Sequence, residues 1–172
     1  LYVSPLQSDA AAHMADEVRD LVRRYAFDGV YLDHVRFPAD DYDYGARSIA
    51  AFRDWVRGRV DLERRRTIDE QEEIDPLAYP TALPVDWRAF RRGQLTALLA
   101  RIRTAVRASR PAATVAVALA DADVRAGDGE RLADWRTCVD SGFVDAVGPA
   151  LAGDLAAQAG VELSRLVAVA GQ

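Results

Sequence analysis

The chain has 172 residues and a net charge of −5, which is enough for one domain with a proper hydrophobic core. Arg64, Arg65 and Arg66 lie between acidic neighbours, so the sequence shows no extended basic surface and we do not expect a nucleic-acid partner. The single cysteine, Cys138, excludes an internal disulfide and a cysteine-based metal cluster, and we expect it to be a buried structural thiol. No apolar run has the length of a transmembrane helix.

Residues 1–5 have the composition of a strand end. Apolar residues then recur at helical spacing from Met14 to Tyr25, which predicts an amphipathic helix. An apolar strand follows over residues 27–33, and a second helical pattern comes after it. A strand between two helices is typical of a parallel sheet, in which functional groups gather at the carboxyl ends of the strands.

The stretch from Phe27 to Pro38, FDGVYLDHVRFP, has the highest density of chemically active side chains. Because strand side chains alternate between faces, Tyr31 and Asp33 are expected on one face and His34 on the other. We therefore predict packing or a supporting role for His34. Asp28 begins the strand, at the end opposite to the site, and is expected to be structural.

An acidic and aromatic loop follows, and it includes Asp43 and Tyr44. Carboxylates that accept hydroxyl hydrogen bonds and aromatic rings that stack on pyranoses suit a sugar site, although an ordinary polar loop fits the pattern equally well. A short amphipathic helix is expected from Ile49 to Val56. Residues 58–86 are charged and contain three prolines near their end, and we expect an irregular lid or rim over the active-site face.

The second half of the chain continues to alternate helices with strands. A helix is predicted over residues 87–109, a buried strand over 114–120, a helix from about Glu130 to Gly142, a strand over 143–148, and a last helix and strand in the tail, ending at 166–170. The fold class is therefore α/β, with about five parallel strands. No dinucleotide or phosphate-loop fingerprint is present. We expect part of a (β/α)8 TIM barrel, cut from a longer protein, because a complete barrel needs roughly 250 residues.

The stretch 28–38 also resembles the signature of the glycosyl-hydrolase-like 10 family of bacterial proteins, approximately D-G-hydrophobic-x-L-D-x-x-R-hydrophobic-P. A second segment, Trp87 to Gln94, resembles a W-x-x-x-R-R segment of the family. The resemblance covers roughly residues 1–150. It implies a barrel glycoside hydrolase that acts on a polysaccharide, such as a bacterial cell-wall glycan, in a secreted or cell-envelope protein. The residues of the signature that fall in register are Asp28, Gly29, Leu32, Asp33, Arg36, Phe37 and Pro38.

Glycosidic hydrolysis usually takes two carboxylates. Asp33 is the first candidate and Asp121 the second, because each follows a strand; Asp123 and Asp43 are the alternatives to Asp121. Arg36 could keep Asp33 ionised or could anchor the loop. The residues predicted to bind substrate are Tyr31, Arg36, Asp43, Tyr44 and Asp123.

We expect no cofactor. With only two histidines in the chain and no His-x-His or His-x-x-x-His spacing, zinc is not expected, while calcium held by loop aspartates stays open. One departure from the family pattern points to a second function. Where relatives have a P-M-x-Y-like segment, Pro149 is followed by Ala150, Leu151 and Ala152. The alternative is a catalytically inactive barrel that binds carbohydrate or supports an assembly.

Overall fold

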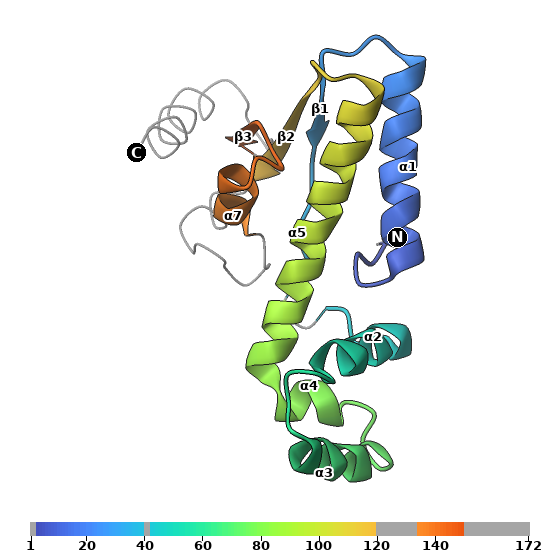
Figure 1. Cartoon of the computed structure of the whole chain (residues 1–172), viewed down its shortest axis with the longest axis vertical. Helices are drawn as coiled ribbons and strands as arrows, with labels where there is room; N and C mark the ends of the chain where they lie inside the picture. Colours follow the sequence, from blue (N-terminus) through green and yellow to red (C-terminus); the bar gives the residue numbers. More distant parts are fainter. Residues whose placement is uncertain (1–2, 40–41, 120–133, 150–172) are drawn as a thin grey trace.

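A computed structural model describes residues 3–39, 42–119 and 134–149, and its centre is a parallel β-sheet (Figure 1). Strands β1 (Gly29–Leu32), β2 (Thr114–Leu119) and β3 (Ala146–Pro149) pair in sequence order, and both pairs are parallel. The predicted order and direction of these strands are confirmed. Residues 3–5 lie outside any strand, contrary to prediction, and the strand predicted at 166–170 lies outside the described residues.

The two faces of the sheet differ because side chains alternate along each strand. On one face Val115, Val117 and Leu119 are buried in a hydrophobic core. On the other face the half-exposed Tyr31 pairs in register with Ala116. The residues that share this second face with Tyr31 are small: Gly29, Ala116, Ala118, Ala146 and Gly148.

Three helices pack on the valine-rich face: α1 (Ser8–Arg24), α5 (Pro84–Ser109) and α7 (Trp135–Asp140). Helices α1 and α5 lie side by side in Figure 1. Among the described residues, the helices in contact with the sheet thus all cover one face, as predicted. Gly142 ends the last of them with a left-handed φ of 67°, and the Phe143 amide donates to the Cys138 carbonyl at 2.8 Å.

A second hydrophobic core lies at the start of α5, where α2 (Ala46–Val56), α3 (Leu62–Glu72) and α4 (Ala78–Ala82) pack together. The prediction that residues 58–86 are irregular is wrong. Asp61 caps α3 by accepting the Arg64 amide hydrogen at 2.9 Å. Ile68 and Tyr79 are buried on the inner side of these short helices. Pro84 opens α5 at a position where its missing N–H costs no hydrogen bond.

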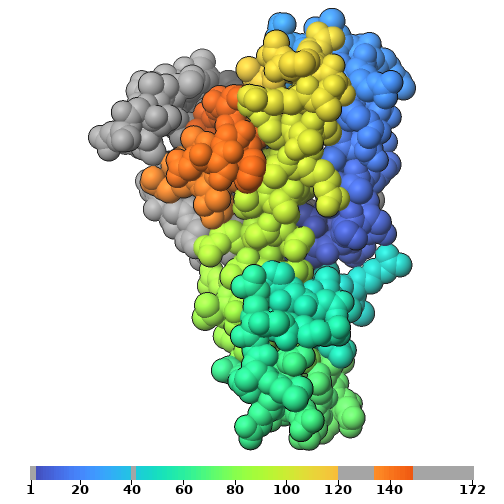
Figure 2. Space-filling view, viewed as in Figure 1, coloured from blue at the N-terminus to red at the C-terminus, as the bar shows by residue number. Residues whose placement is uncertain are grey.

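These three short helices lie at the end of the molecule toward which β1 points (Figure 1). Their teal and green atoms form a distinct lobe at that end in Figure 2. The reason is the connectivity: the chain leaves the carboxyl end of β1, builds α2, α3 and α4, and returns along α5 to the start of β2. The charged segment between β1 and α5 is therefore a folded lobe beyond the carboxyl end of the first strand.

Candidate functional site

Asp33 directly follows the last residue of β1. Its side chain is 45% exposed. Oδ1 accepts the backbone N–H of His34 at 2.7 Å, and Oδ2 lies 2.9 Å from Nδ1 of the same histidine. The carboxylate is thus oriented by its immediate neighbour while it stays open to solvent.

The expected position of His34, on the face opposite to Asp33, is wrong. β1 ends at Leu32, so strand alternation no longer applies to the two residues after it. His34 has a left-handed backbone with φ of 59°, and its side chain is 75% exposed. The turn brings its imidazole to the carboxylate of Asp33, so the packing role is excluded and the supporting role is the one that the geometry favours.

An open cleft of about 510 Å³ lies beside the carboxyl end of β1. Asp33, His34 and Arg36 line it from the β1 side, and His13 and Glu17 line it from α1. Apolar side chains of α1 and α5 form its wall. Polar groups gathered on an apolar wall are the usual composition of a ligand site.

Tyr31 also lines this cleft, and its ring extends across the sheet toward β3. A Cβ at Gly148 would lie 3.0 Å from the Tyr31 hydroxyl oxygen, so the glycine makes room for the phenol. Partial burial and, to a lesser degree, the negative charge of Asp33 raise the pKa of Tyr31. The charge of Asp33 is the smaller of the two causes, and the expected shared face of Tyr31 and Asp33 stays a prediction because Asp33 lies beyond the last residue of β1.

The carboxylate of Asp43 is bound within the loop. Ser48 donates to its Oδ2 at 2.7 Å and the Gly45 amide to its Oδ1 at 2.9 Å. Burial alone would raise its pKa, but the hydrogen bonds from Ser4, Ser48 and Gly45 outweigh that effect and lower the pKa. Asp43 therefore organises the start of α2, and its predicted contact with substrate stays a prediction.

Tyr44 stacks near the start of α5, with its ring centroid 5.4 Å from that of Trp87. Beneath these rings lies a buried cation, Arg91, which is 1% exposed and donates to the Tyr42 carbonyl. Its guanidinium carbon is 5.2 Å from the Trp87 ring centroid and 5.8 Å from that of Tyr44. The sequence analysis assigned no role to Arg91. The sequence feature that could have pointed to it is the pair of arginines in the segment WRAFRRGQ, residues 87–94.

The second predicted carboxylate, Asp121, and the predicted substrate ligand Asp123 lie outside the described residues. Leu32 pairs with Val117, so the carboxyl ends of β1 and β2 are neighbours in the sheet. Residues 150–153, the place of the departure from the family pattern, also lie outside the described residues.

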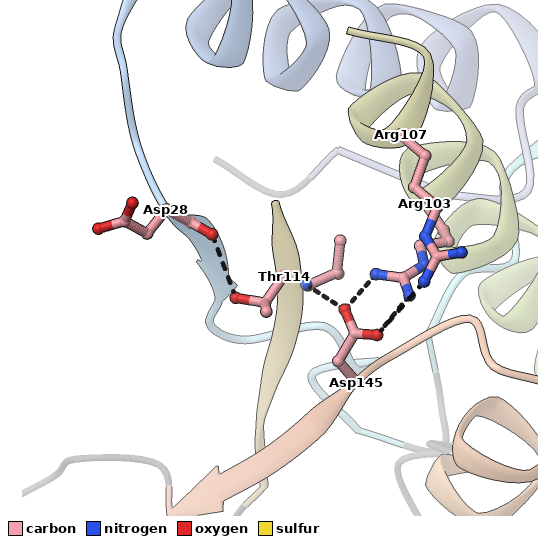
Figure 3. Close-up of polar contacts among 6 residues, drawn as sticks. Asp28, Arg103, Arg107, Thr114 and Asp145 are labelled. Carbon is pink, nitrogen blue, oxygen red and sulfur yellow. Dashed lines mark hydrogen bonds and ion pairs between the residues drawn. The ribbon is translucent and has the colours of Figure 1, made fainter. Parts of the chain in front are cut away.

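The opposite end of the sheet is held by polar contacts that sequence reasoning missed (Figure 3). Arg103 forms two hydrogen bonds with the carboxylate of Asp145, which also accepts the Val115 amide at 2.8 Å. At the same end the carbonyl of Asp28 accepts the Thr114 amide at 3.0 Å. Asp28 thus directly precedes β1, at the end of the strand away from the cleft, and its backbone carbonyl helps to hold β2, which agrees with the expected structural role.

Cys138 is a buried thiol, as predicted, and burial raises its pKa to about 11. It lines a small, mostly apolar pocket of about 10 Å³, which has room for no more than a water molecule. Within residues 3–39, 42–119 and 134–149, no cluster of three or more histidine, cysteine or carboxylate side chains is arranged to hold a metal ion. No helix in that part of the chain is long and apolar enough to cross a membrane.

The sequence model of the family described as glycosyl hydrolase-like 10 matches residues 1–166. No curated protein matches the chain. The matched range contains β1 and its cleft as well as Arg91 and the lobe.

Proposed function

The chain belongs to the glycosyl hydrolase-like 10 family, and from this we propose that it is part of a glycoside hydrolase that cleaves O-glycosidic bonds in a bacterial polysaccharide, with Asp33 as a principal carboxylate. The observation that carries the proposal is the position of Asp33. It lies at the carboxyl end of β1, exposed and next to Tyr31 in an open cleft. That is where parallel α/β enzymes assemble their catalytic groups.

We propose that the sheet belongs to a (β/α)8 barrel. Three parallel strands in sequence order, with helices against one face, support this architecture. In a barrel the other face, with Tyr31 and its small neighbours, turns toward the barrel axis. The α2–α4 lobe then borders the mouth of the barrel and serves as a rim of the substrate site.

A second carboxylate is needed for hydrolysis, and Asp121 is the proposed partner, with Asp123 and Asp43 as alternatives. A separation of roughly 5–5.5 Å between the two carboxylates gives retention of the anomeric configuration, and roughly 6.5–9.5 Å gives inversion. The oxygens of Asp43 already accept internal hydrogen bonds, which counts against a catalytic role for it.

The proposed substrate is a cell-wall glycan or another complex polysaccharide, acted on by a secreted or cell-envelope protein. The proposed substrate ligands among the described residues are Tyr31, Arg36, Asp43 and Tyr44. Tyr31 is 49% exposed and Tyr44 is 38% exposed, so each offers part of an aromatic face to a sugar ring. No cofactor is proposed, because two carboxylates and water suffice for this reaction.

The test is Asp33→Asn in the full-length protein, with released reducing ends measured on purified bacterial cell-wall glycan. The substitution keeps the shape of the side chain and removes its charge, so we expect hydrolysis to be lost. Asp16→Asn on α1 is the matched control, because Asp16 is an exposed carboxylate paired only with Arg19 on its own helix. Hydrolysis at the wild-type rate by Asp33→Asn would refute the assignment.

A catalytically inactive carbohydrate-binding barrel is the second candidate. The partly exposed rings of Tyr42 and Tyr44 favour it, because such rings bind sugars without any catalytic group. In this case the wild-type protein binds cell-wall glycan in a pull-down assay but releases no reducing ends. Tyr44→Ala then weakens binding, while Asp33→Asn leaves it unchanged.

A further inference from the structure

Asp33 and His34 form a pair through Nδ1 of the imidazole, and Nε2 is the nitrogen on the other side of the ring. Oδ2 of Asp33 lies 2.9 Å from Nδ1 of His34. A carboxylate at this distance from Nδ1 favours a proton on that nitrogen; the neutral ring then presents Nε2 as its acceptor, and the charged ring presents Nε2–H as a donor. The same division of labour, in which a carboxylate orients and a histidine carries the proton, activates many enzymes.

The backbone of His34 produces this arrangement. Its φ of 59° turns the chain back after the strand, and its own N–H donates to Oδ1 of Asp33 at 2.7 Å. Both carboxylate oxygens are therefore engaged by one residue. With 75% of its side chain exposed and its ring at the lining of the cleft, His34 is accessible to a bound ligand.

We propose that His34 is the proton donor of this site and that Asp33 is the carboxylate that orients it. This inference rests on the proposed glycosidase function: Asp33 stays the carboxylate of the acid group, and His34 is the group through which it protonates the leaving sugar. The second carboxylate, on another strand, then stabilises or attacks the anomeric carbon.

In this step Nε2–H of protonated His34 gives its proton to the glycosidic oxygen while the bond between that oxygen and the anomeric carbon breaks. The electron pair of the bond stays on the oxygen, so the leaving sugar departs as a neutral alcohol. Water supplies the hydroxyl group to the anomeric carbon, and its remaining proton restores the imidazolium. The sum is hydrolysis with no oxidant, reductant or metal.

Other charged and titratable groups face the same cleft and would modulate the pair. Arg36 and Tyr31 lie on the β1 side, and His13 and Glu17 lie on α1, where Nε2 of His13 is 3.8 Å from Glu17. His13 is thus the second histidine of the cleft and is paired with a glutamate of its own helix.

The test uses two substitutions that both tolerate a left-handed backbone, His34→Gly and His34→Asn. Asparagine retains an amide donor for the Asp33 carboxylate but has no proton to give, whereas glycine removes the side chain entirely. We expect both variants of the full-length protein to lose about 10²–10⁴-fold in kcat/KM on bacterial cell-wall glycan. On p-nitrophenyl glycosides, whose leaving group needs little protonation, the loss is expected to be much smaller.

Three results would overturn the proposal. Recovery of the wild-type rate by His34→Asn would reduce His34 to a positioning residue. An equal loss on cell-wall glycan and on p-nitrophenyl glycosides would mean that no proton transfer is involved. If Asp33→Asn is inactive and His34→Gly is fully active, the proposed function stands and this inference fails.

A second measurement needs no enzymatic turnover, so it tests the proposal even if the protein hydrolyses neither cell-wall glycan nor p-nitrophenyl glycosides. Nitrogen NMR of the histidine ring reports which nitrogen carries the proton in the neutral form. We expect the proton on Nδ1 in the wild type and a shift of the tautomer population toward Nε2–H in Asp33→Asn. A neutral His34 with its proton on Nε2 in the wild type would contradict the dyad.

Discussion

Arg103 on α5 binds Asp145, the residue before β3, through two guanidinium–carboxylate hydrogen bonds (Figure 3). Because Asp145 also accepts the Val115 amide of β2, one carboxylate joins a helix to two strands. Asp145→Asn keeps the shape but leaves Arg103, whose side chain is 7% exposed, without its counter-ion. We expect a loss of about 3 kcal/mol in the free energy of unfolding, measured by urea denaturation. Asp54→Asn, at an exposed pair with Arg57, is the control and should change stability by less than about 1 kcal/mol.

The same ion pair predicts a dependence of stability on pH. Hydrogen bonds from Arg103 and the Val115 amide, and the charges of Arg103 and Arg107, lower the pKa of Asp145 in the folded protein against the opposing effect of burial. Its contribution is therefore complete above the ordinary aspartate value of 3.8 and is lost as the pH falls through the lower folded value. Urea midpoints measured down to this acidic range should fall more steeply for the wild type than for Asp145→Asn. If the urea midpoints of the two proteins fall in parallel with pH, the pKa of Asp145 is not lowered by Arg103, Arg107 and the Val115 amide.

Gly29 of β1 and Thr114 of β2 are too close to admit a side chain on the glycine. A Cβ at Gly29 would lie 2.2 Å from the Thr114 hydroxyl and 2.7 Å from its backbone carbonyl oxygen. We expect Gly29→Ala to lower the free energy of unfolding by about 1–3 kcal/mol, because the strands must separate to accept it. Adding Thr114→Ala should restore part of this loss, since only the hydroxyl is removed. Gly58→Ala, where nothing lies within 4 Å of the new Cβ, should cost nothing measurable.

The phenol of Tyr31 reports on the charge of Asp33. Because burial and the Asp33 charge both raise the pKa of Tyr31, Asp33→Asn should lower that pKa part of the way to the ordinary value of 10.0. Spectrophotometric titration of tyrosinate, with Tyr31→Phe to identify the signal, measures the change. If the pKa of Tyr31 is the same in the wild type and in Asp33→Asn, the two side chains are not electrostatically coupled, and the proposed site loses this support.

Local patterns in the sequence were sufficient for the elements that face the core. The spacing of Met14, Val18 and Val22 predicted α1, and the apolar run from Thr114 predicted β2, because burial on one side repeats with the period of the backbone. The alternation of helices with strands predicted the parallel order. These inferences also placed Asp33 at the carboxyl end of a strand, which is the basis of the proposed function.

Residues 58–86 show where that reasoning fails. Prolines and charged residues predict an irregular segment, but in the structure Asp61 caps α3 and Pro84 is the first residue of α5. The apolar residues that anchor the short helices, Ile68 and Tyr79, are too few to produce a helical period. Their helices depend on packing against Trp87 and Phe90 of α5, and a contact of this kind leaves no periodic trace in the segment itself.

The polar contacts of the molecule were decided by the tertiary structure. Arg103 and Asp145 are 42 positions apart, and Arg91 and Tyr42 are 49 apart; no local pattern links either pair. The predicted face of His34 was wrong for a different reason. The strand ends at Leu32 and His34 has a left-handed backbone, so strand alternation does not give the direction of its side chain. The sequence by itself determined which side of α1 and β2 faces the core, although Leu21 and Tyr25 of the predicted apolar pattern are 49% and 47% exposed. Only the folded chain determined which charges meet, because an ion pair depends on the distance between two side chains in space and a periodic pattern records only the side of an element on which each one lies.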